Sequence, residues 1–208
     1  LLYGSNTIGG VIDVSRETGS NPIFDKLSQQ YLFGTESSNN SRYANIISYL
    51  PINKRNQVRF SILNRTTDNQ TAIMDDTTKI LKNTALTNNE IIGAYSYFGK
   101  KNQLMFSFSK IKMDYGIPGS LEGHIDGVDI KMSKRSFRIN FHQDISFLNF
   151  KRLDVDQRYI LYSHSEYENN NDYATVSLGQ NIYSFQSMLS SDKVKLGSMF
   201  QYRDYRAG

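Results

Sequence analysis

The chain has 208 residues, of which 38% are hydrophobic, with a mean hydropathy of −0.51 and a formal net charge of +4. No stretch approaches the roughly 18 apolar residues that a spanning helix needs, so a helical membrane protein is excluded; a transmembrane β-barrel, in which every second residue faces lipid, is not. The basic residues are scattered and form no nucleic-acid-binding motif. The chain contains no cysteine, which excludes disulfides and thiolate metal sites.

The first stretch, Leu1–Val14, reads LLYGSNTIGGVIDV. A turn is expected at residues 4–6, because Gly and Asn tolerate positive φ, and the β-branched run after Gly10 is typical of a strand. Residues 15–23 are polar and rich in turn-forming residues, so we expect a linker there. Since the chain begins without an initiator methionine, we expect it to be a piece of a longer protein.

From residue 24 onward, β-type runs alternate with turn-rich connections, and no helical period persists. The predicted strands cover residues 24–34, 43–50, 58–65, 91–98, 104–113, 128–144, 153–167, 174–189 and 194–205. Odd-numbered connections tend to be long and polar, and even-numbered ones short, although the first is of ambiguous length and the sixth, expected around 146–151, is of medium length. Outer-membrane barrels alternate long outer loops with short periplasmic turns in this way, whereas a β-sandwich has no reason to do so.

Side chains in the predicted strands alternate between apolar and polar. In the third strand Val58, Phe60 and Ile62 share one face, and Arg59 lies on the other. An arginine facing lipid at mid-depth would cost roughly 2–4 kcal/mol, so in a barrel Arg59 is expected to face the lumen. A sheet with one solvated face produces the same alternation, so this pattern alone leaves both architectures open.

The sixth predicted strand changes phase along its length. Apolar residues occupy even positions up to Met132 and odd positions from Phe137 onward. The change near residues 134–136 indicates either a β-bulge or a part of the strand that stands clear of a membrane. The basic residues around it, Lys134 and Arg135 among them, favour the second interpretation.

Three segments resemble a known family. Leu1–Val14 resembles the end of the plug domain in TonB-dependent outer-membrane receptors, where a Y-G-S-x-x-I-G-G-V-I-[ND]-V pattern precedes the barrel. The residues of this plug motif are Tyr3, Gly4, Ser5, Gly9 and Gly10. The Y-G-I-P-G run at 115–119 and the Y-x-H-x-E-x-E run at 162–168 are similar to segments in a branch that includes zinc-uptake and some haem- and siderophore-uptake members.

The resemblance implies an all-β fold, an antiparallel transmembrane β-barrel that is incomplete here, with about nine strands of a plugged barrel of roughly 22. It assigns residues 1–14 to the end of the plug, 15–23 to a linker and 24–208 to the N-terminal part of the barrel. The whole protein would lie in the outer membrane of a Gram-negative-type cell, in contact with lipid. It would take up a small nutrient, either an iron chelate (siderophore or haem) or a metal ion such as zinc, with energy from TonB through parts outside this chain.

Candidate ligand-binding residues are sparse. The connection 114–127 offers Asp114, Glu122, His124 and Asp126, and a divalent ion takes three or four N or O ligands, although a solvated loop with an incidental histidine would contain the same residues. The connections 66–89 and 168–173 are further places for substrate contacts.

Other residues that carry chemistry have simpler interpretations. His142 and His164 occupy strand positions and are expected in the wall or its rim. No nucleophile–base pair, phosphate loop or catalytic carboxylate pair is recognisable, so we expect no enzyme, no cofactor and no nucleic-acid partner. The alternatives are a secreted β-sandwich binding domain and a segment of a passive porin.

Overall fold

The structure is a computed structural model that describes residues 24–74, 77–119, 127–168 and 171–208. Within these residues the chain is all-β, as the sequence predicts. No helix in this described part has the length and apolar character needed to cross a bilayer. The expected plug end at 1–14 and the linker at 15–23 lie outside the described residues.

The main sheet has nine antiparallel strands in the order β1-β2-β3-β6-β7-β8-β9-β10-β11, so each strand pairs with its neighbours along the chain. Its strands are β1 Ser28–Glu36, β2 Ser41–Asn53, β3 Asn56–Thr67, β6 Leu86–Phe98, β7 Asn102–Ile117, β8 Val128–Phe147, β9 Phe150–Glu168, β10 Val176–Ser190 and β11 Lys195–Ala207. All nine predicted strands are therefore confirmed, most of them longer than expected.

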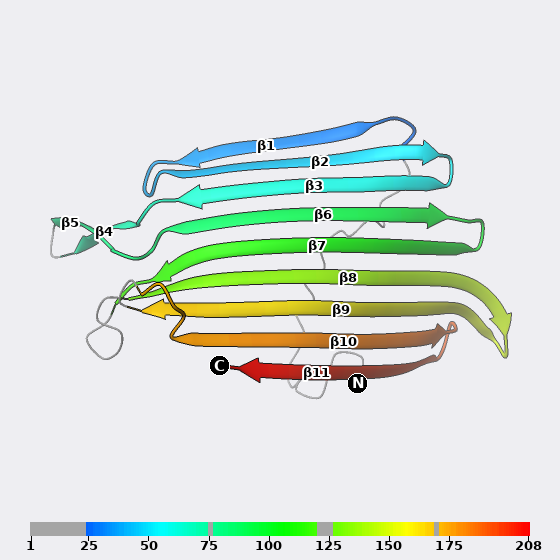
Figure 1. Cartoon of the computed structure of the whole chain (residues 1–208). Helices are drawn as coiled ribbons and strands as arrows, with labels where there is room; N and C mark the ends of the chain where they lie inside the picture. The colour runs from blue at the N-terminus through cyan, green and yellow to red at the C-terminus, as the bar shows by residue number, and fades with distance from the viewer. Residues whose placement is uncertain (1–23, 75–76, 120–126, 169–170) are drawn as a thin grey trace.

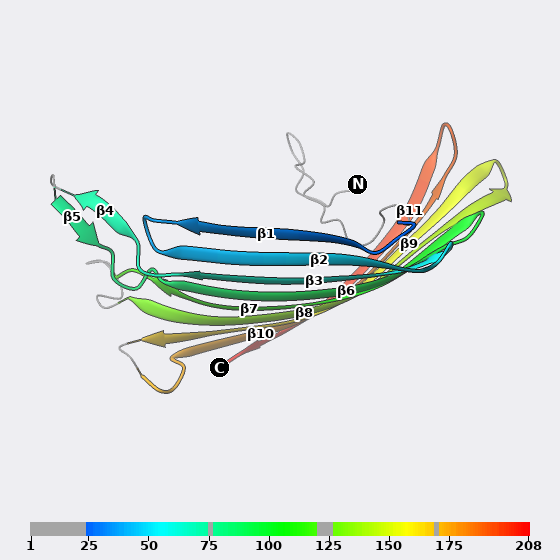
Figure 2. The same cartoon turned by 90° about the horizontal axis from the view of Figure 1, so that it is seen from above.

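The connections divide between the two ends of the sheet (Figure 1). The short turns β2–β3, β6–β7, β8–β9 and β10–β11 lie at one end, and the longer connections β3–β6, β7–β8 and β9–β10 lie at the other, together with the β1–β2 connection, which is as short as β10–β11. The sheet is curved and open, and among the described residues β1 and β11 each pair with one strand only (Figure 2). Strand edges with unpaired N–H and C=O groups are sites for pairing with further chain.

Two sequence predictions about connections are wrong. The polar connection predicted between residues 66 and 89 contains a hairpin of β4 Thr71–Met74 and β5 Thr77–Ile80, closed at its base by the Leu81 N–H donating to the Gln70 carbonyl at 2.8 Å. β-branched Thr and Ile favour strands even where the sequence is polar. The medium connection predicted at 146–151 is a tight turn at Leu148 and Asn149, because β8 and β9 both extend further.

One face of the main sheet, here called the belt face, carries a continuous apolar surface. Directly paired positions across six neighbouring pairs of strands place these residues in one row: Phe60, Gly93, Phe108, Phe137, Tyr159, Tyr183 and Tyr202. Nothing in the described structure covers this row fully, since Phe60 is 43% exposed, Phe137 46% and Tyr202 59%. Soluble monomers rarely expose continuous apolar patches of this kind.

The opposite face, here called the polar face, carries Arg59, Ser107, Arg138 and Asp156. Arg59 thus lies on the face opposite Phe60, as the alternation predicts. Near β2 and β3 this face is also the more buried one, and Tyr49 is only 2% exposed.

The phase change in β8 has no bulge. The pairing of β8 with β7 and β9 is regular through residues 134–136, and its one irregularity lies between Asp144 and Phe147. The bulge interpretation is therefore wrong. The two faces exchange polarity towards the long connections, where the belt face carries Lys110 and Arg135 and the polar face carries Ile130.

The β8–β9 turn forces a leucine into the left-handed region, with φ of 44° at Leu148 and 70° at Asn149. This conformation costs an L-residue roughly 1–2 kcal/mol, whereas it costs Gly little. We expect Leu148→Gly to raise the free energy of unfolding by about 1 kcal/mol, measured by denaturant titration of the full-length protein. Asn149→Gly is the matched control and should change the free energy of unfolding less, since Asn tolerates the left-handed region. An equal or larger increase in Asn149→Gly would contradict the explanation.

Candidate binding surface

The structure describes only Asp114 of the four sequence-predicted ligand residues. Glu122, His124 and Asp126 lie outside the described residues, as do the plug-motif residues Tyr3, Gly4, Ser5, Gly9 and Gly10. Asp114 lies inside β7 and not in the loop that follows it, and it pairs with Thr87 on one side and Lys131 on the other. Its side chain is exposed on the belt face, beyond the apolar row. The loop site remains a prediction.

The Y-G-I-P-G run has a structural role at its first glycine. Asn83, which lies between β5 and β6, donates from its side-chain nitrogen to the Ile117 carbonyl at 2.9 Å. A Cβ at Gly116 would stand 2.7 Å from the Asn83 carbonyl carbon. Only glycine allows this close approach, so the run holds the long β3–β6 connection against the end of β7.

The best-defined polar cluster lies on the polar face of β8 and β9. Arg138 and Arg158 are directly opposite each other, and like charges in that position repel. The Asp156 carboxylate lies between them, 2.5 Å from Arg138 Nε and 3.7 Å from Arg158 Nη2, and it also accepts from the Asn140 amide. Asp156 and Arg138 are half-buried, with side chains 23% and 29% exposed. One carboxylate therefore holds two guanidinium groups and an amide in place.

The cluster continues towards the short turns through His142. Its Nδ1 lies 3.1 Å from Asp154 and its Nε2 lies 3.2 Å from Asp144. Asp154 also accepts two hydrogen bonds from the Arg152 guanidinium, at 2.7 and 2.8 Å. The imidazole is thus fixed between two carboxylates in the wall of the sheet, and His142 occupies a strand position as the sequence indicates.

A second group lies on the polar face nearer the long connections, beyond the apolar belt. The Tyr162 hydroxyl is 3.1 Å from His164 Nδ1, and His164 Nε2 is 2.8 Å from Glu166 Oε1. Burial raises the pKa of Tyr162, and the neighbouring Tyr115 adds to this increase. The three side chains thus form one hydrogen-bonded chain, Tyr162–His164–Glu166, in which the imidazole uses both of its nitrogens.

This second group is flanked by soft apolar side chains. Met132 pairs directly with His164 across β8 and β9, and Met113 pairs with Met132 across β7 and β8. Methionine adapts its shape and contacts aromatic surfaces favourably. A protonated phenol, an imidazole, a carboxylate and two thioethers on one face can bind a small ligand that has both polar and apolar parts.

A third polar region lies on β2 and β3. The Arg59 guanidinium lies over the Tyr49 ring at 5.7 Å from its centroid, and the Phe24 ring is 4.8 Å from the same ring. The Phe24 N–H donates to the Gln57 side chain at 3.0 Å. The chain that leads into β1 therefore contacts the polar face at Phe24.

These clusters support binding and electrostatic positioning. In the described ranges, no group of three or more His, Cys, Asp or Glu is placed to hold a metal ion. Sequence reasoning missed Arg138, Asp154, Asp156 and Arg158 as a unit. The signal was present in β9, where charged residues occupy every second position from Arg152 to Arg158.

Comparison with protein-family models finds no family that matches this chain. A search of curated proteins gives no significant match either.

Proposed function

We propose that residues 24–208 form part of the wall of a plugged transmembrane β-barrel, in a TonB-dependent outer-membrane receptor that takes up a scarce nutrient. The observation that carries the proposal is the pair of unlike faces. The belt face exposes aromatic and aliphatic side chains from β3 to β11, while the polar face holds charged side chains in hydrogen-bonded clusters. A barrel wall in a bilayer needs an apolar outer surface and tolerates a polar interior.

The placement of the connections supports the same proposal. Long connections at one end and short turns at the other match the outer and periplasmic ends of such barrels. The belt does not reach the long-connection end, where Lys110, Lys112 and Arg135 occupy the same face. In the proposed orientation these basic residues stand outside the bilayer, and the long connections reach the external medium.

The nutrient is either an iron chelate, as a siderophore or haem, or a metal ion such as zinc. The sequence resemblance supports this choice, and the polar face offers a place for it at Tyr162, His164 and Glu166. The proposed entry from the long-connection end would bring a ligand to this group before it meets the Arg138–Asp156 cluster. Energy would come from TonB through parts of the protein outside this chain.

The experiment that tests the transport proposal is growth of a deletion strain under separate iron, zinc and cobalamin limitation. We expect a defect under iron or zinc limitation that the full-length gene restores. Equal growth of the deletion and parent strains under all three conditions would remove the metal hypothesis. A complementing gene with His164→Ala and Glu166→Ala should restore growth less well than one with the matched change Ser163→Ala and Ser165→Ala, which lies on the belt face.

A further inference from the structure

The short-turn end of the sheet carries a repeated pair of basic residues. Each of the four short turns has two of them in the turn or next to it: Lys54 and Arg55, Lys100 and Lys101, Lys151 and Arg152, and Lys193 and Lys195. All eight side chains are exposed. Neighbouring short turns are two strands apart, which is roughly 10 Å, so the pairs form an evenly spaced row along one edge. We call this row the basic rim.

The connections at the opposite end have the other balance of charge, although Lys110, Lys112 and Arg135 lie on the belt face near them. By sequence, the long connections 68–85, 118–127 and 169–175 contain Lys79 and Lys82 as their basic residues and these acidic residues: Asp68, Asp75, Asp76, Glu122, Asp126 and Asp172. At the short-turn end the nearest carboxylates pair with one basic pair only. Lys151 forms an ion pair with Asp192, and Arg152 binds Asp154. Among the described residues, no carboxylate pairs with Lys54, Lys100 or Lys101.

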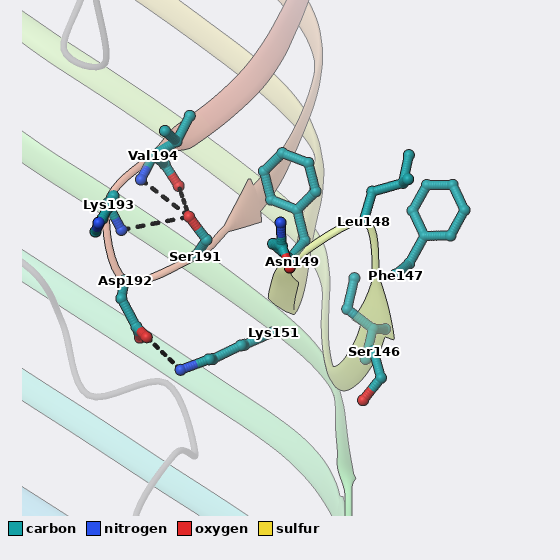
Figure 3. Close-up of a pocket in the computed structure, with 11 residues that line it drawn as sticks. Ser146, Phe147, Leu148, Asn149, Lys151, Ser191, Asp192, Lys193 and Val194 are labelled. Carbon is teal, nitrogen blue, oxygen red and sulfur yellow. Dashed lines mark hydrogen bonds and ion pairs between the residues drawn. The ribbon is translucent and has the colours of Figure 1, made fainter.

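Apolar side chains lie beside the basic rim. Phe147 is 61% exposed, Leu148 74% and Val194 56%. A cavity of about 700 Å³ lies between the β8–β9 and β10–β11 turns (Figure 3). Its Ser191 hydroxyl is occupied with the backbone of its own turn, accepting from the Val194 N–H at 3.0 Å. Figure 3 shows Phe147 and Leu148 on the side of the cavity away from Lys151 and Asp192.

The strained backbone at Leu148 is a separate observation. Glycine or asparagine would take its φ of 44° at lower cost, yet an exposed leucine occupies the position. Strain kept at an exposed residue points to a use for its side chain. An apolar tip next to basic side chains is the combination found where proteins meet the headgroup region of a membrane.

We propose that the basic rim binds the phosphate groups of anionic phospholipids, with Leu148 and Val194, in the β8–β9 and β10–β11 turns, inserted at the headgroup–acyl boundary. The inference rests on the proposed transmembrane wall, since the rim contacts lipid only if the belt face lies in a bilayer. Arg152 and Lys195 share one row on the polar face, so the other six basic side chains of the rim are the ones that meet the leaflet on the short-turn side. Phosphatidylglycerol is the occupant because each headgroup presents one net negative charge to such a row.

The test uses the full-length protein in phosphatidylcholine bilayers that contain trace spin-labelled phosphatidylglycerol or spin-labelled phosphatidylcholine. The fraction of motionally restricted probe gives the relative affinity for the two lipids. We expect the wild type to prefer phosphatidylglycerol. The ratio of the two affinities should fall several-fold in K54Q/R55Q/K100Q/K101Q. In K100Q/K101Q the logarithm of this ratio should fall by about half as much. The matched control K79Q/K82Q removes two charges at the other end and should keep the wild-type preference. Salt at about 1 M should abolish the preference.

The outcomes separate the two proposals. Restricted lipid with equal affinity for both probes, or an equal loss in the K79Q/K82Q control, would overturn the basic rim while leaving the transmembrane wall intact. A preference that survives in the quadruple variant would also overturn it and would leave the basic pairs to a soluble acidic partner. No motionally restricted lipid in any variant would overturn the transmembrane wall and the basic rim together.

Discussion

Phe106→Arg is expected to lower the free energy of unfolding in lipid bilayers by roughly 2–4 kcal/mol, or to prevent insertion altogether. Phe106 lies on the belt face of β7, between Tyr95 and Ile139 and well inside the belt from Lys110, and its side chain is 45% exposed in the isolated sheet. A guanidinium group at that position would face the hydrocarbon core without a partner. Urea unfolding of the full-length protein in vesicles measures the change.

The control for this prediction lies on the same strand. Ser109 is on the polar face, between Ile92 and Ser136. Ser109→Arg adds the same charge to the proposed interior and should change stability by much less than Phe106→Arg. If the belt face were in water, Phe106→Arg would stay within about 0.5 kcal/mol of the wild type. Equal effects of the two variants would therefore contradict a lipid-facing belt.

Asp156→Ala is expected to destabilise the folded protein by about 1–3 kcal/mol. The change removes the carboxylate between Arg138 and Arg158, so two directly opposite guanidinium groups lose their shared partner and the Asn140 amide loses its acceptor. Removing one member of a partly buried charged cluster leaves the others desolvated and unpaired. The free energy of unfolding, again measured in vesicles with urea, gives the loss.

A double-mutant cycle separates this electrostatic cause from simple loss of packing. Arg158→Gln in the Asp156→Ala background removes the repulsion and should restore part of the stability. Gln186→Ala is a matched control, because Gln186 pairs with Asp156 on the same face of β10 and carries no charge. Additive effects of Asp156→Ala and Arg158→Gln would show that the two side chains are not coupled.

The positions of the strands followed from the sequence because alternation and turn residues are local signals. The third strand and its apolar face were predicted from the alternation of Val58, Phe60 and Ile62. The β6–β7 turn was predicted from Gly99 and Lys100. The β4–β5 hairpin was missed because Thr71–Met74 and Thr77–Ile80 are too short and polar for a clear pattern. The end of β8 was placed too early, since nothing in a leucine predicts the positive φ of Leu148.

The polar clusters were harder to foresee, because they depend on register. Arg138 and Asp156 are 18 positions apart in the chain, and only the β8–β9 pairing places them together. The phase change in β8 was visible, yet its regular backbone could not be distinguished from a bulge without the pairing of both neighbours. His164 was predicted as a wall residue, whereas its contacts with Tyr162 and Glu166 required knowing that all three share a face.

The most direct measurement places a fluorophore at consecutive positions of β7 in the full-length protein. These 208 residues contain no cysteine, so once any cysteine elsewhere in the protein is replaced by serine, single cysteines at residues 105–109 can each be labelled in turn and the protein reconstituted with brominated, quenching lipid. We predict strong quenching at positions 106 and 108 and weak quenching at 105, 107 and 109. Quenching without this alternation, or no quenching at any of the five positions, would contradict a wall with its belt face in the bilayer.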